Sequence, residues 1–299
     1  MAHDTYELGV SEFTTWPWTF EQDVEAYRRH GVAAIEITEA KLDPVRIPQQ
    51  IALITGGSSL KVCSVQAKVH SLYPTLLQPE PRDPRDRLRH IRESIAAIAP
   101  HVPGASFVVI TGAPPSGDVH EVLRTARRDF PELARFAEAH GVRIALEPLN
   151  PALMNVDSSL WSLGDGLDLI DDVGHAAFGL CLDTWNVWQS PLLYEDVARA
   201  GERIFLVQVS DWRVPRGHYD RLVPGEGGIP LISMVDAIRT AGYVGPYVVE
   251  IFSSESLPES LWRADLDAVL ERCVLGFEKI WGAVVEGGPF PKGGRVAVS

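Results

Sequence analysis

Four polar residues each follow a run of apolar residues in the second half of the chain. They are Glu147 in RIALEPLN, Asp183 in GLCLDTWN, Gln208 in IFLVQVSDWR and Glu250 in PYVVEIF. Such runs are typical of buried strands, and a carboxylate at the end of a buried strand is costly unless a cation or solvent neutralises it. Three acids and one amide from four successive strand ends therefore indicate one metal site.

The spacing of these residues indicates the fold that brings them together. Glu147 and Asp183 are 36 residues apart, Asp183 and Gln208 are 25 apart, and Gln208 and Glu250 are 42 apart. A (β/α)8 barrel has about 31 residues per β/α unit, and its chemistry takes place where the strands end. We therefore expect a single (β/α)8 TIM barrel of the α/β class. The alternative, that each acid is separately solvated or salt-bridged, is less favoured when four occur in succession.

The composition agrees with one large barrel. The chain has 299 residues, of which 45% are apolar and 22% are charged, so it can bury a large core. Its 27 basic and 40 acidic residues give a net charge of −13, which disfavours nucleic-acid and anionic-membrane partners because these need clustered Lys and Arg. We expect a barrel over residues 1–285 and a C-terminal tail over 286–299 that is either mobile or an interface arm.

Cysteine usage and the N-terminal sequence bear on the compartment. Cys63, Cys181 and Cys273 are odd in number and far apart, which predicts buried thiols in a reducing cytosol. The first residues lack the basic segment and long apolar stretch of a secretion signal, and no stretch reaches about 18 apolar residues. A soluble, cytoplasmic protein is the resulting expectation.

Strand and helix patterns alternate along the chain. Strands are expected at 5–13, 32–38, 60–71, 105–112, 143–150, 179–186, 204–213 and 246–252. Helices are expected at 20–31, 83–102, 117–141, 158–175, 194–202 and 231–242, with a last helix from about Ser256. We expect Pro131 to interrupt the helix at 117–141 and Gly164 to break the helix at 158–175.

A His–Gly pair precedes a strand at two places, residues 30–31 and 140–141. Histidine at a helix C-terminus interacts favourably with the helix dipole, and the glycine after it can take a positive φ. The recurrence indicates repeated β/α units and predicts that His30 and His140 are helix caps, not metal ligands.

Five motifs contain or adjoin the polar residues described above. They are LEPLN with Glu147, LDTWN with Asp183, VQVSDWR with Gln208, RLVPGEG at 221–227 and GYVGPYVVEIF with Glu250. Together they resemble the xylose isomerase-like TIM-barrel superfamily, in its sugar phosphate isomerase/epimerase branch, over essentially the whole chain. The resemblance implies that the four residues hold a divalent cation, which binds two oxygens of a keto sugar or keto cyclitol. It also implies that Glu147 and Glu250 lie on either side of the substrate and carry protons.

Two positions depart from that family. Many of its epimerases have histidine where this chain has Gln208 and Asn186, and glutamine at the first position resembles dehydratase members such as 3-dehydroshikimate dehydratases. A glutamine oxygen beside three carboxylates gives an all-oxygen set of ligands, which suits Mn²⁺ or Mg²⁺ better than Zn²⁺. We therefore expect Mn²⁺ or Mg²⁺ as the cofactor.

A cation beside carboxylates predicts proton transfer next to a carbonyl group. Removal of that proton leaves an enolate, and a cation on the oxygen stabilises it by several kcal/mol. Return of the proton to a neighbouring carbon defines an isomerase, return to the opposite face an epimerase, and loss of a β-hydroxyl or glycosidic oxygen a lyase. We expect an isomerase or epimerase that acts through a metal-stabilised enediolate. The alternatives are a lyase, whether a 3-dehydroshikimate or inosose dehydratase or an enzyme of keto-glycoside β-elimination, and a non-catalytic sugar-binding barrel.

Further polar residues are candidates for substrate binding, namely Lys68, His70, Asn186, Arg213, Arg216 and His218. His70 is expected to end strand 60–71, with Lys68 on the same face, and to act as a general acid or to bond to the backbone. Arg221 shares a loop with Arg213 and Arg216, and each can bind a phosphate or carboxylate or remain solvated.

Three other features have both a structural and a functional interpretation. The PGEGG turn at 224–228 either forms an anion-binding nest or only closes a loop, and Asp211 is expected to support the metal ligands from behind. Trp16 and Trp18 either line an apolar wall or plug the barrel. The expected partner is a small carbohydrate or cyclitol, with no nucleic acid and no membrane, and homo-oligomerisation is left open.

Overall fold

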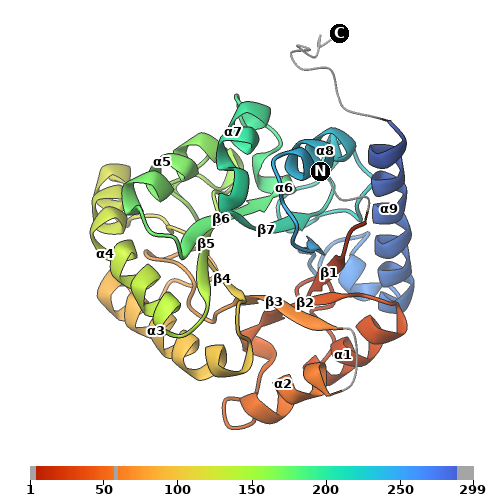
Figure 1. Cartoon of the computed structure of the whole chain (residues 1–299), viewed down its shortest axis with the longest axis horizontal. Coiled ribbons are helices and arrows are strands. Elements are labelled where there is room, and N and C mark those ends of the chain that lie inside the picture. The colour runs from red at the N-terminus through yellow and green to blue at the C-terminus, as the bar shows by residue number, and fades with distance from the viewer. Residues whose placement is uncertain (1–4, 57–59, 288–299) are drawn as a thin grey trace.

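Eight parallel strands form a closed barrel in the computed structural model, which describes residues 5–56 and 60–287. The strands follow one another around the barrel in sequence order, and β8 pairs with β1 to complete the ring (Figure 1). Their bounds are β1 Leu8–Ser11, β2 Ala34–Thr38, β3 Lys61–Gln66, β4 Ser106–Val109, β5 Arg143–Leu146, β6 Phe178–Asp183, β7 Ile204–Val209 and β8 Tyr247–Val249. The predicted single (β/α)8 barrel is confirmed.

Helices connect the strands and surround the barrel (Figure 1). Their bounds are α1 Phe20–Arg29, α2 Ile47–Thr55, α3 Pro84–Ile98, α4 Val119–Ala139, α5 Leu163–Val173, α6 Thr184–Val187, α7 Leu193–Ala200, α8 Leu231–Thr240 and α9 Leu266–Glu286. One large apolar cluster joins strand residues such as Leu146 and Val207 to helix residues such as Phe130 and Phe277. The outer faces of the strands are thus used for packing against helices.

The inner faces of the strands carry a second, smaller apolar cluster with polar residues above it. The small cluster consists of Val108, Ala145, Cys181, Leu206 and Val248. Two positions after its last four members come Glu147, Asp183, Gln208 and Glu250. Because side chains alternate along a strand, residues two apart point to the same side. The four polar residues therefore lie one level above an apolar plug, at the carboxyl ends of their strands.

Both predicted histidine caps are confirmed. His30 caps α1 and His140 caps α4 at their C-termini, and the glycines that follow have φ values of 69° and 71°. The His140 Nδ1 also bonds to the carbonyl oxygen of Phe136 at 2.8 Å. Neither imidazole lies with the four polar residues above the apolar plug.

Two helix interruptions were predicted wrongly. Helix α4 continues through Pro131, because proline deprives only the Arg127 carbonyl of its helical partner and Arg127 is exposed to water. Helix α5 is not broken at Gly164 but begins at Leu163, where the Ser162 side chain accepts a hydrogen bond from the Asp165 N–H. The predicted helical residues before Ser162 lie in the preceding loop.

Other helix limits also differ from the prediction. The last helix begins at Leu266 and not near Ser256, because the Asp265 carboxylate caps it by accepting from the Asp267 N–H. Trp262 instead lies in a short 3₁₀ turn, Leu261–Arg263. Helices α2 and α6 were not predicted, and α6 follows β6 directly, with Asp183 as its N-cap.

Strand β3 ends at Gln66, so the prediction that it reaches His70 was wrong. Lys68 and His70 lie in the loop that follows, where the His70 Nδ1 is 3.0 Å from the carbonyl oxygen of Ala67. The chain pairs again with β4 only through an isolated bridge between Ser71 and Ile110. The two side chains are therefore placed by a loop and not by a strand face.

The remaining predictions concern thiols, the membrane and the tail. Cys181 and Cys273 are buried, Cys63 is half-buried, and all three are free thiols. Within 5–56 and 60–287, no helix is long and apolar enough to cross a membrane. Helix α9 extends to Glu286, so the domain boundary at 285 stays a prediction, and residues 288–299 of the predicted tail lie outside the described residues.

Candidate active site

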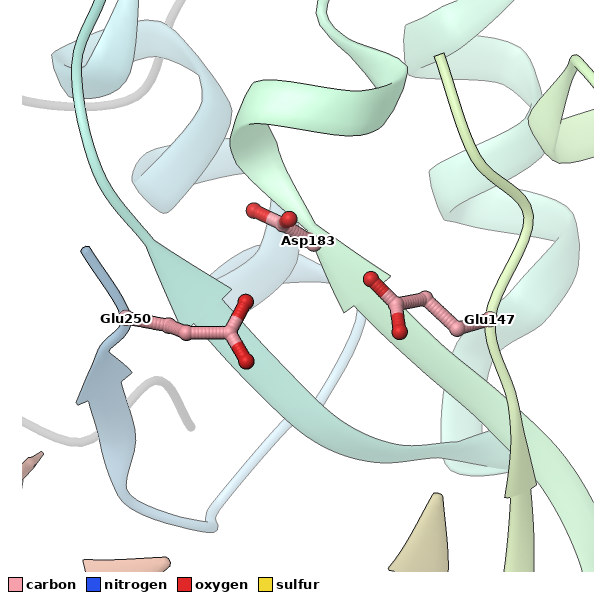
Figure 2. A group of neighbouring side chains, drawn as sticks. All are labelled: Glu147, Asp183 and Glu250. Carbon is pink, nitrogen blue, oxygen red and sulfur yellow. The ribbon is translucent and has the colours of Figure 1, made fainter. Parts of the chain in front are cut away.

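Three carboxylates meet above the apolar plug. Glu147 follows β5, Asp183 ends β6 and Glu250 follows β8, and Figure 2 shows Glu147 and Glu250 facing each other with Asp183 beside them. One oxygen from each lies within 4.8 Å of the other two, and all three residues are buried. Closed parallel barrels bring consecutive strand ends to one mouth, so the fold produces this proximity directly.

Burial makes the negative charges of this cluster costly. Burial first, and the Asp183 charge second, raise the pKa of Glu147 to about 8, while Arg221 acts in the opposite direction. Burial likewise raises the pKa of Asp183 and, more strongly, the pKa of Glu250, again opposed by Arg221. The raised pKa values show that one arginine does not balance full ionisation of the three carboxylates, so an additional cation would be favoured beside them.

Arg221, which the sequence offered only as one of three loop arginines able to bind an anion or remain solvated, is a main residue of the site. Its Nη1 donates to Asp183 Oδ2 at 2.8 Å and to Glu250 Oε2 at 3.1 Å, and its side chain is fully buried. The guanidinium lies 5.0 Å from the Trp185 ring and 4.9 Å from the Phe252 ring. Its sequence signal is its position in RLVPGEG, directly before the buried Leu222 and Val223.

Asn186 joins the cluster from α6. Its Nδ2 donates to Glu147 Oε1 at 2.7 Å and to Asp183 Oδ2 at 2.8 Å, and its Oδ1 accepts from the backbone N–H of Asn150 at 3.1 Å. Both amide hydrogens are therefore directed at carboxylates. In this arrangement Asn186 orients two of the three acids.

Gln208 lies at the centre of the same polar level. Its Nε2 donates to Glu250 Oε1 at 3.0 Å and to Glu36 Oε1 at 2.9 Å, while its Oε1 accepts from the Cys181 thiol at 3.1 Å. Glu36, from β2, is fully buried and also accepts from the Ser64 hydroxyl at 2.7 Å. The sequence places Glu36 near the end of β2, but it does not show that this carboxylate reaches Gln208.

A cavity of about 670 Å³ opens above the cluster. Glu147, Glu250 and Arg221 line it, as do three of the predicted substrate-binding residues, Lys68, His70 and His218. Burial lowers the pKa of His70 and, more strongly, that of His218, where the Arg221 charge adds to the effect. Both imidazoles are therefore neutral at pH 7.

The other three predicted substrate-binding residues do not line this cavity, and one of them, Asn186, binds the carboxylates as described above. Arg216 pairs with Asp220 at 2.6 Å and with Glu259, and Arg213 lies 3.6 Å from Glu259. Asp220 of the same loop and Glu259 of a neighbouring loop thus bind the arginines that were expected to bind substrate. Of the three arginines in this loop, it is Arg221 that points to the acids of the site.

The PGEGG turn already contains an anion from the chain itself. The Asp211 carboxylate accepts from the backbone N–H groups of Gly225 at 3.0 Å, Gly227 at 2.9 Å and Ile229 at 2.9 Å. A side chain at Gly227 would collide with this carboxylate, since an added Cβ would lie 2.4 Å from Asp211 Oδ1. Of the two interpretations of this turn, loop closure therefore holds for these three groups, and Asp211 supports the loop after β7.

Comparison with known proteins identifies similar chains. A family model described as xylose isomerase-like TIM barrel matches residues 24–273. An inosose isomerase of Halalkalibacterium halodurans is 29% identical over 140 residues, which are 45% of this chain and 48% of that relative. An inosose isomerase of Bacillus velezensis is 24% identical over 247 residues, 79% of this chain and 84% of that protein. The first alignment thus spans about half the length of the relative it matches.

Solved structures share the fold at lower sequence identity. The protein SMc04130 from Sinorhizobium meliloti 1021 superposes with a TM-score of 0.80 at 23% identity, over 91% of this chain and 98% of that one. The IolI protein, described with a bound zinc atom, superposes with a TM-score of 0.73 at 20% identity, over 93% and 99% of the two chains.

Proposed function

Since this chain belongs to the xylose isomerase-like TIM barrel family, we propose that it is a metal-dependent isomerase or epimerase of a keto sugar or keto cyclitol. The observation that carries the proposal is the pair Glu147 and Glu250, which face each other beside Asp183 at the floor of the cavity (Figure 2). Similarity to two inosose isomerases supports a cyclitol or sugar as substrate.

The residues of the site fit a divalent cation. Glu147, Asp183 and Glu250 offer oxygens within 4.8 Å of one another, and the buried Glu36 adds a fourth carboxylate nearby, against the single guanidinium of Arg221. Carboxylate oxygens suit Mn²⁺ or Mg²⁺, which remain our proposal for the metal. When bound, the cation supplies positive charge to the substrate carbonyl, which makes the neighbouring C–H more acidic.

The two glutamates are placed to move the proton. A ring held between them has one carboxylate near each face, so one glutamate takes the proton from carbon and the other returns it. Return of the proton to the opposite face of the same carbon inverts that stereocentre, which is epimerisation. Return of the proton to the adjacent carbon moves the carbonyl group, which is isomerisation. The cavity above the glutamates holds neutral imidazoles in His70 and His218, which leaves the carboxylates as the stronger bases of the site.

Arg221 and Asn186 keep the carboxylates in place during this transfer. Arg221 holds Asp183 and Glu250 and also lines the cavity, where the rest of its guanidinium can donate to a substrate oxygen. Asn186 holds Glu147 and Asp183 from the side. Gln208 is a fourth ligand in our proposal if its amide turns its oxygen, instead of its nitrogen, towards Glu250.

A lyase is the second candidate, and the size of the cavity favours it. The space of about 670 Å³ leaves room for a leaving group beside the ring that loses its proton. In that reaction the C–H proton goes to a carboxylate, the β C–O bond breaks, and the departing oxygen takes a proton from an acid of the cavity wall. Tyr219 lines that wall and carries the necessary O–H group, whereas the one N–H of neutral His70 is directed at the Ala67 carbonyl oxygen.

Proton NMR in D₂O separates these reactions. The protein with Mn²⁺ is incubated with ketoses, inososes and dehydroshikimate in turn. Deuterium in a recovered or isomerised ring supports the isomerase or epimerase, and an unsaturated product supports the lyase. Absence of both for every compound would remove the proposed chemistry and leave the non-catalytic barrel.

A further inference from the structure

The cavity is larger than the ring that the facing glutamates hold. Its volume is about 670 Å³. A six-membered sugar or cyclitol has about a dozen non-hydrogen atoms, each smaller than the roughly 30 Å³ share of a water molecule in the liquid. One ring therefore fills about half of the cavity at most, and a second group of similar size fits beside it.

The unfilled part is bounded by a continuous aromatic wall. Phe252 lies 4.9 Å from the Arg221 guanidinium, and its ring is 4.5 Å from the ring of Phe13. Phe13 in turn stacks on Trp16 at 5.5 Å with 14° between the planes, and Trp16 stacks on Trp262 at 6.2 Å. All four aromatic rings line the cavity. The wall thus begins beside the carboxylates and extends through Trp16, which is 39% exposed, to Trp262.

The aromatic wall is fixed in place. The Trp262 Nε1 donates to the backbone carbonyl oxygen of Phe13 at 2.8 Å, which ties the loop before α9 to the loop after β1. Trp18, in contrast with Trp16, packs against the main core and does not line the cavity. Of the two interpretations of these tryptophans, Trp16 therefore lines an apolar wall of the cavity, whereas Trp18 packs in the core.

A second part of the cavity lining is also built into the fold. Leu77 and Gln78 line the cavity from the loop between β3 and α3. The buried Arg87 holds this loop by donating to the carbonyl oxygens of Ser71 at 2.7 Å, Gln78 at 3.1 Å and Pro81 at 2.9 Å. Hydrogen bonds therefore hold both parts of the lining in place.

We propose that the substrate has two rings: a keto sugar or cyclitol ring between Glu147 and Glu250, and a second ring with an apolar face on Trp16 and Trp262. An aromatic substituent linked to the sugar through oxygen is the chemical class that matches this wall, because aromatic rings stack in offset geometry on indole. The inference rests on the proposed function for the first ring, and it makes Trp16 a residue that determines specificity.

Comparison of the affinities for two stable glycosides tests the contribution of the second ring separately from that of the sugar. Phenyl β-D-glucopyranoside and methyl β-D-glucopyranoside share the sugar and differ only in the aglycone. Isothermal titration of the Mn²⁺-loaded protein is expected to show about tenfold tighter binding of the phenyl compound, which corresponds to 1.4 kcal/mol. Equal affinity for the two glycosides overturns the proposal.

Two matched variants test whether the preference for the phenyl glycoside arises at Trp16. Trp16→Ala is expected to reduce the ratio of the two affinities to about one. Tyr194→Ala is the control, because Tyr194 is also an exposed aromatic residue, at 38% against 39% for Trp16, but lies on α7 and does not line the cavity. The control should keep the tenfold ratio. A ratio that survives Trp16→Ala places the phenyl group elsewhere and excludes the aromatic wall as its site.

The outcome is separable from that of the proposed function. Deuterium incorporation into a free inosose together with equal affinity for the two glycosides rejects the second ring and retains the isomerase or epimerase. Preference for the phenyl compound without any exchange or elimination supports the aromatic subsite and rejects the proposed chemistry.

Discussion

Glu36 on β2 accepts hydrogen bonds from the Gln208 amide on β7 at 2.9 and 3.2 Å, across the interior of the barrel. The same amide nitrogen also donates to Glu250. The orientation of the one neutral residue of the proposed metal site is therefore set by a carboxylate far away in sequence. Replacement of Gln208 tests both the proposed ligand and this contact.

Gln208→His is expected to keep the metal but to shift preference towards Zn²⁺ and Co²⁺, by about tenfold or more. Imidazole is a softer donor than an amide oxygen, and Glu36 can accept the N–H of its second nitrogen. Competition between Mn²⁺ and Zn²⁺, measured on the variant and the natural protein, gives the preference. Unchanged affinity for both ions excludes Gln208 from direct contact with the metal.

Glu147→Gln and Glu250→Gln are each expected to reduce turnover by roughly 10²–10⁴-fold, because the amide keeps an oxygen of similar position but cannot accept the proton. Activity is measured at saturating Mn²⁺ with metal occupancy determined in the same samples. Loss of turnover at full occupancy assigns proton transfer to the replaced glutamate. Recovery with excess metal leaves that residue a ligand only, and recovery of both variants directs the search for the base to Lys68 and His70.

Arg221→Met is expected to destabilise the metal-free protein by about 3–5 kcal/mol, because it removes the charge that the buried Asp183 and Glu250 share. Mn²⁺ should restore part of this loss, since it supplies positive charge to the same carboxylates. Urea unfolding with EDTA and with Mn²⁺ provides the comparison. A loss of the same size under both conditions contradicts a cation between these acids.

Glu12→Gln is expected to change the pH dependence of stability. Burial, followed by the nearby Asp23, raises the pKa of Glu12 well above its ordinary value of 4.5. The folded protein therefore holds a proton that the unfolded chain releases above about pH 4.5, so the contribution of Glu12 to stability falls as the pH rises above that value.

Glutamine removes this pH dependence while it keeps an oxygen for the Thr38 N–H, which Glu12 binds at 2.7 Å. The variant should gain stability relative to the natural protein between pH 5 and pH 8, as measured by urea unfolding at several pH values. A constant difference across that range would show that Glu12 keeps the same charge in both states.

The fold and the carboxylates at the floor of the site could be predicted from the sequence, because both follow from regularly spaced apolar runs. Apolar runs that end in Glu147, Asp183 and Glu250 at barrel spacing predict both the strands and their meeting point, and the structure brings these three residues together. Strand periodicity also places Gln208 on their side of β7. These inferences need no knowledge of loop conformation.

The residues that were missed depend on contacts between distant segments. Arg221 is one of several arginines in a long loop, and only the folded chain shows that it reaches Asp183 and Glu250 while Arg216 pairs with Asp220 and Glu259. The start of α9 was misplaced because apolar periodicity from Trp262 continues through a loop that the Asp265 cap separates from the helix. Local sequence shows which residues are apolar or charged, but contacts with distant residues determine which way a side chain points and where a helix begins.

The Asp211 carboxylate occupies the PGEGG turn. Because this anion is covalently part of the chain, it cannot dissociate as a bound solute would. The three N–H groups that would attract a phosphate are occupied by an acid 14 to 18 residues earlier in the same chain. The turn therefore needs no anion from solution to satisfy these three N–H groups. Asp211 follows β7 and the turn precedes α8, so these hydrogen bonds hold the loop that carries Arg221 without help from any substrate.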